Sequence, residues 1–121
     1  MSTSLINQLL ALSPHIRYVA VYQNGTLTSA VREGLATASS PETDRYEELL
    51  VNPALVTITR QRGDIDGGGM RYLLVRYGNF FQLVLPHADG HVSVAIEPGP
   101  DPVSLAALVE RTLKERGRRG R

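Results

Sequence analysis

Residues 70–97 read MRYLLVRYGNFFQLVLPHADGHVSVAIE, three apolar runs separated by two short turns. The turns are Gly78-Asn79 and Ala88-Asp89-Gly90, and Gly, Asn and Asp are residue types that favour chain reversal. Apolar runs of this length, with clear alternation in the last one (HVSVAIE), are typical of β-strands. The stretch therefore predicts a three-stranded antiparallel meander whose first strand covers 70–77.

A predicted hairpin precedes the meander. The runs IRYVAVYQ (16–23) and TLTSAVRE (26–33) flank Asn24-Gly25. Asn-Gly is the strongest short-range hairpin signal, because a type I′ turn requires positive φ at both central residues. The first run is apolar on both of its alternating faces, which predicts a sheet covered on both sides.

Helices are expected at both ends of this chain. Residues 4–12 (SLINQLLAL) have the apolar spacing of an amphipathic helix. Asp101-Pro102 is a good start for the last helix, with Asp as N-cap and Pro at the first helical position. Gly117 is expected to end this helix. Its predicted buried face consists of Leu105, Leu108, Val109 and Leu113.

The middle of the chain, 42–62, is predicted to be helical, with a kink at Asn52-Pro53 that divides it into 42–51 and 53–62. The second piece contains the β-branched run Thr-Ile-Thr, so a strand is the alternative there. Glu47 and Glu48 are expected on the exposed side of this helix. The stretch Gly63–Gly69 (GDIDGGG) is expected to be a flexible connector, because it lacks the Lys and Ser/Thr of a phosphate-binding loop.

The fold class that follows is α/β (α+β): a five-stranded antiparallel sheet with helices on both faces, in the order α-β-β-α-β-β-β-α. A chain of 121 residues is long enough for one domain with one core. We place this domain at 1–115, followed by a disordered basic tail at 116–121.

Composition excludes several classes of protein. There is no cysteine, which rules out disulfides, thiol catalysis and cysteine-ligated zinc. No apolar run approaches the roughly 20 residues that span a bilayer, and the first residues lack the pattern of a signal peptide. The expectation is a cytoplasmic protein with no membrane contact.

Charge is unevenly distributed along the chain. Residues 1–110 carry seven basic and eleven acidic side chains, a net charge of −4, although the whole chain is +1. The excess of positive charge comes from the C-terminal end, where the basic residues are Arg111, Lys114, Arg116, Arg118, Arg119 and Arg121. Such a segment can attract phosphate or acidic partners, but it has no aromatic residue for base stacking.

The sequence contains no recognisable catalytic apparatus and indicates no cofactor. There is no nucleophilic-serine motif, and no pair of carboxylates is expected in the core. His87 and His91 flank the second meander turn, but two imidazoles make an incomplete metal site. Phe80 and Phe81 should point to opposite faces of their strand. Core packing is the simpler role for them, and contact with a partner is the alternative.

The helix 4–12, the hairpin around Asn24-Gly25, the helical middle, the meander and the final helix together resemble the roadblock (dynein light chain) family within the longin/profilin-like group. The resemblance covers about residues 3–115. It implies a non-enzymatic module that forms a homodimer, and a scaffold or regulator of a small Ras-like GTPase or of a motility complex.

The resemblance also implies which segments meet in that dimer, namely the middle helix and the strand that follows it. An unprotected edge strand independently invites pairing with another chain. The expected interface residues are Tyr46, Leu49, Leu50, Arg71, Leu73 and Val75.

Two alternatives come from other functional classes. A profilin-like sheet can form a pocket for a small molecule, which requires a cavity of several hundred Å³ with converging polar groups. The arginine-rich end could instead make the protein a nucleic-acid accessory, with binding that depends strongly on salt.

Overall fold

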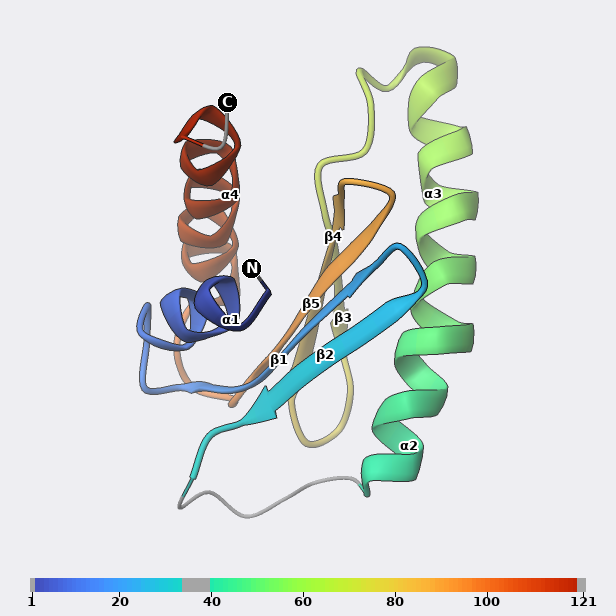
Figure 1. The fold of residues 1–121 in the computed structure, drawn as a ribbon. Helices are drawn as coiled ribbons and strands as arrows, with labels where there is room; N and C mark the ends of the chain where they lie inside the picture. The colour runs from blue at the N-terminus through green and yellow to red at the C-terminus, as the bar shows by residue number, and fades with distance from the viewer. Residues whose placement is uncertain (1, 34–39, 120–121) are drawn as a thin grey trace.

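The described residues are 2–33 and 40–119, in a computed structural model shown in Figure 1. Residues 120 and 121, part of the expected tail, lie outside this range. The elements in chain order are α1 (Ser2–Leu10), β1 (Ile16–Gln23), β2 (Thr26–Val31), α2 (Pro41–Tyr46), the π-helical turn η1 (Glu47–Val51), α3 (Asn52–Asp66), β3 (Leu73–Arg76), β4 (Phe81–His87), β5 (Gly90–Ile96) and α4 (Pro102–Arg119).

The five strands form one antiparallel sheet in the order β2-β1-β5-β4-β3. α1 and α4 cover one face, and the continuous helical segment α2-η1-α3 covers the other (Figure 1). This arrangement confirms the predicted fold class and order of elements. The β1–β2 turn is the type expected, since both Asn24 and Gly25 have positive φ (55° and 76°).

Several predicted boundaries are wrong. β3 begins at Leu73 rather than at Met70, because a longer ladder would place Arg71 opposite Pro86, which has no N–H to donate. α3 continues through Gly63 to Asp66, supported by an ion pair one turn apart between Arg62 and Asp66 (2.7 Å).

α4 continues past Gly117 to Arg119, so the first four residues of the expected disordered tail are helical. Glycine weakens a helix interior without forbidding it, and the flanking arginines are good helix formers. The alternative of a strand at 53–62 is also wrong, since this piece is entirely α3.

The main hydrophobic core lies between the sheet and the α1/α4 layer. Leu9 of α1, Val94 of β5 and Val109 of α4 are completely buried there. Leu105 of α4 is also buried in this core, and Leu108 and Leu113 pack against it half-buried, as the spacing predicted. Each Å² of apolar surface removed from water stabilises the folded state by about 25 cal/mol, so this layer contributes strongly to the stability of the fold.

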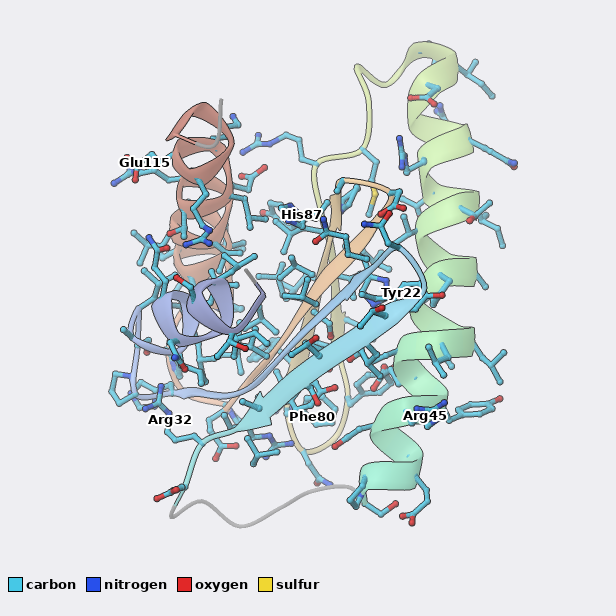
Figure 2. All side chains as sticks on the ribbon, viewed as in Figure 1. Tyr22, Arg32, Arg45, Phe80, His87 and Glu115 are labelled. Atoms are coloured by element: carbon cyan, nitrogen blue, oxygen red, sulfur yellow. The ribbon has the colours of Figure 1, made fainter. Side chains whose placement is uncertain are left out.

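Arg32 connects the end of β2 to the end of α1 and the start of β1 (Figure 2). Its guanidinium donates to the carbonyl of Leu10 at the end of α1, to that of Ser13 (2.8 Å) and to that of Ile16 (2.7 Å). Carbonyls at the C-terminal end of a helix have no partner within the helix. One side chain therefore satisfies three backbone groups at the start of the sheet.

Candidate functional site

The two faces of the sheet differ in chemistry. The face under α2-η1-α3 has only a small apolar cluster, in which Tyr18, Ala20 and Ala95 are buried. The other buried side chains in this layer are Val56 and Val84, which are apolar, and the polar group Glu48, Asn52, Gln82, His91 and Ser93. The long helical segment therefore lies on a surface where buried polar and apolar side chains are mixed, in contrast to the aliphatic core on the opposite face.

Glu48 is the centre of this polar group and is only 1% exposed. Its Oε1 lies 2.8 Å from His91 Nε2 on β5 and accepts a hydrogen bond from Asn52 Nδ2 (2.9 Å). Its Oε2 accepts from the Tyr18 hydroxyl on β1 (3.2 Å). The carboxylate thus joins the helical segment to two strands, and we call these four residues the Glu48 cluster.

The burial of Glu48 contradicts the exposed position expected for it, and the π-helical turn explains the difference. Pro53 has no N–H, so it cannot bond to the carbonyl of Leu49. The N–H of Asn52 donates to the carbonyl of Glu47, five residues back rather than the usual four. This wider turn changes which side chains face the sheet, and Glu48 is among those that do.

The Glu48 cluster is structural in character. Burial, and then the Glu48 carboxylate, raise the pKa of Tyr18 far above its ordinary value of 10.0, so its hydroxyl remains a donor. His91 is only 2% exposed, and its ring packs against that of Tyr22 with centroids 5.6 Å apart. The cluster fixes the position of the helical segment on the sheet.

The outer side of the helical segment exposes large apolar side chains, together with charged ones such as Arg62 and Asp66. Tyr46 and Leu50, two of the expected interface residues, are 59% and 61% exposed. Ile58 and Ile65 are exposed to a similar extent, at 65% and 76%. Neither isoleucine is among the interface residues expected from the sequence, because 53–62 is compatible with a strand and Ile65 lies in the expected connector.

The remaining expected interface residues lie on or beside the edge strand β3. Leu73 and Val75 are half-buried and share the sheet face under the helical segment. Leu49 is half-buried on η1. Arg71 is different, because its guanidinium pairs with Glu110 of α4 on the opposite layer (2.7 Å). The structure therefore gathers five of the six residues on one side of the sheet and places Arg71 on the other.

Phe80 and Phe81 point to opposite faces, as expected from their adjacent positions. Phe80 packs against the small cluster around Tyr18, with the Arg17 guanidinium 4.5 Å from its ring centroid (Figure 2). Phe81 packs against the main core, and Arg76 lies over its ring. Each phenylalanine is half-buried and covered by an arginine, so core packing accounts for much of their surface.

His87 and His91 also lie on opposite faces of the sheet. His87 is on the α4 side with Arg116, whereas His91 faces α3. They cannot share a metal ion. In residues 2–33 and 40–119, no group of three or more His, Cys, Asp or Glu side chains is arranged to hold one. Within the same residues, no helix is long and apolar enough to cross a membrane.

Acid is expected to destabilise the fold partly through His87. Burial, and then the Arg116 charge, lower the pKa of His87 from its ordinary 6.5. The unfolded chain then binds more protons, so stability falls as the pH drops from about 6.5 through the lowered value. His87→Gln should lose less stability than the parent between about pH 7 and pH 5 in thermal melts. Equal losses in the two proteins would contradict this role.

No protein-family model and no curated protein matches this chain. Solved structures do share its fold. The roadblock/LC7 domain from Streptomyces avermitilis is 16% identical, with a TM-score of 0.66 over 93% of this chain and 94% of that one. The gliding protein MglB from Thermus thermophilus is 9% identical, with a TM-score of 0.59 over 94% of this chain and 89% of that one.

A structure of MglB with a tetrameric arrangement gives 11% identity and a TM-score of 0.57, over 94% of this chain and 88% of that one. The chain is thus an α+β protein with helices on both faces of an antiparallel sheet. Its fold is that of the roadblock domain, as the order of its elements predicted.

Proposed function

We propose that this protein is a non-enzymatic interaction module that works as a homodimer. The observation that carries the proposal is the side of the molecule formed by the helical segment and β3. Large apolar side chains are exposed along the helix, and β3 is an edge strand that, among the described strands, pairs with β4 alone. Exposed apolar surface beside a free sheet edge is typical of an interface.

In the proposed dimer, β3 of one subunit pairs with β3 of the other, and the two helical segments pack against each other. Tyr46, Leu49 and Leu50 supply the helical contacts, and Leu73 and Val75 the strand contacts. Tyr77 supports this surface, because its hydroxyl donates to Glu47 Oε2 (3.1 Å) and connects the β3–β4 turn to η1. Arg71 belongs to the rim, where its pair with Glu110 steadies the approach to β3.

The partner we propose for the dimer is a small Ras-like GTPase or a component of a motility complex, with the protein acting in the cytoplasm as regulator or scaffold. The resemblance of the elements to roadblock domains supports this partner class, and the fold shared with the gliding protein MglB supports it further. Phe80, on the β3–β4 turn, and Phe81, at the start of β4, are the proposed partner contacts.

The homodimer is tested with Leu50→Glu. An unpaired carboxylate buried in an apolar interface costs several kcal/mol, so the dimer dissociation constant should rise by about 100-fold or more. Sedimentation equilibrium at micromolar concentration measures it. The matched control is Val103→Glu, because Val103 is 53% exposed but lies on α4, on the opposite layer.

The dimer proposal is wrong if the parent protein is a monomer. It is also wrong if Leu50→Glu and Val103→Glu have the same dimer dissociation constant. The partner class is tested separately, by measuring binding of purified small GTPases of the same organism in their GDP and GTP-analogue forms. Binding that Phe80→Ala leaves unchanged would move the contact away from the β3–β4 turn.

A further inference from the structure

A cavity of about 350 Å³ lies between α3 and the ends of β1 and β5. Its α3 wall includes Val56, Arg60 and Asp64, spaced so that they share one side of the helix. Its sheet wall includes Tyr22 and His91, and Asp89 in the β4–β5 turn also lines it. Figure 2 shows Tyr22 on the α3 side of the sheet.

The floor of this cavity is apolar, aromatic and fixed in position. Val56 is 7% exposed, and the Tyr22 ring packs against His91. His91 in turn is held by Glu48 at 2.8 Å. Such a floor can pack against the body of a small molecule without first having to become ordered, which favours binding.

Both signs of charge line the cavity. Arg60 and Asp64 make no ion pair within 4.0 Å among residues 2–33 and 40–119, although their spacing of four residues permits one. On the same helix, Arg62 and Asp66 with the same spacing do pair, at 2.7 Å. Asp89 accepts the N–H of Asn24 (3.1 Å), which holds its carboxylate in place in the lining of the cavity.

We infer that this cavity binds a free amino acid with an apolar side chain. Its carboxylate would meet the Arg60 guanidinium, and its ammonium group would meet the carboxylates of Asp64 and Asp89. Its side chain would pack on Tyr22 and Val56. The two carboxylates disfavour phosphorylated ligands, because like charges repel.

The cavity and the proposed dimer interface share no residues. Tyr46 and Leu50 lie on the outer side of the helical segment, and β3 is at the sheet edge, whereas the cavity adjoins β1 and β5. Amino-acid binding therefore goes beyond the proposed function. Either proposal can fail while the other holds.

The test is a titration of the full chain with L-phenylalanine and with L-leucine, each up to about 10 mM. Amide NMR and calorimetry monitor the binding. The expected result is saturable binding, with the largest shifts at residues 56–64 and 89–91. N-acetyl-L-phenylalanine and L-phenylalanine amide each lack one charge and should bind at least about tenfold more weakly. If these derivatives bind as tightly as L-phenylalanine, or if neither amino acid binds, the proposal is overturned.

The variants Arg60→Gln and Asp64→Asn should each weaken binding about tenfold or more, because each removes a charge-assisted hydrogen bond. Arg62→Gln and Asp66→Asn are the matched controls on the same helix and should bind like the parent. Sedimentation of all four variants checks whether each still forms the proposed dimer. If the two pairs of variants bind alike, the cavity is not the binding site.

Discussion

Replacing Glu48 with alanine is expected to lower the free energy of unfolding by about 3 kcal/mol. The substitution leaves the Tyr18 hydroxyl, the Asn52 amide and the His91 imidazole without the acceptor that they share. Each unsatisfied buried donor costs about 1–3 kcal/mol, and relief from burying the carboxylate offsets part of this sum. Urea denaturation at one fixed protein concentration measures the loss, since dimer formation adds concentration-dependent stability.

Two further variants separate this cause from a general sensitivity of the helical segment. Glu48→Gln retains the shape, and its amide can donate to Tyr18 while its oxygen accepts from Asn52 and His91, so a loss of only about 1 kcal/mol is expected. Glu42→Ala removes an exposed acid in the first turn of α2 and should cost no more than about 1 kcal/mol. If Glu48→Ala were as stable as Glu42→Ala, the cluster would not hold the two layers together.

Replacing Gly90 with alanine is expected to cost about 3 kcal/mol, near the upper end for inserting a methyl group into a packed site. A Cβ at Gly90 would overlap the carbonyl oxygen of Tyr22 on the neighbouring strand and lie 2.7 Å from its carbonyl carbon. The obstacle is backbone rather than a movable side chain, so β1 and β5 would have to separate where Tyr22 pairs with His91. Thermal and urea unfolding both measure the effect.

Gly117→Ala is the matched control for this prediction. Gly117 lies inside α4, and a Cβ there would meet no atom within 4 Å. The same chemical change should therefore stabilise the protein by about 0.5–1 kcal/mol, because alanine restricts the unfolded chain and favours helix. A Gly90→Ala protein as stable as the parent would show that the strands yield easily at this point.

At Gly90 the turn predicted from the sequence is present, but for a different physical reason. Asp89-Gly90 indicated a turn, and the turn is there, but the positive φ belongs to Ala88 (52°) rather than to Gly90. Glycine is required at position 90 because a carbonyl of another strand approaches it. That carbonyl belongs to a residue 68 positions earlier in the chain, beyond the reach of any local pattern.

The candidate sites were only partly visible in the sequence. Tyr46 and Leu50 were expected in a dimer interface, and both are exposed. The Glu48 cluster was not anticipated, although Asn52-Pro53 gave a local signal that the helix changes there. The sequence could not show that the disturbance widens one turn and brings Glu48 towards the sheet instead of kinking the helix outward.

The sequence by itself determined the order of helices and strands, the hairpin turn at Asn24-Gly25 and the apolar side of α4. These depend on φ preferences and side-chain periodicity within a few residues, which neighbouring positions in the chain specify. The tertiary structure alone decided that Glu48 meets His91 across 43 positions and that His87 and His91 are separated by the sheet. Burial and pairing at such distances depend on how whole layers pack, so they exist only once the chain has folded.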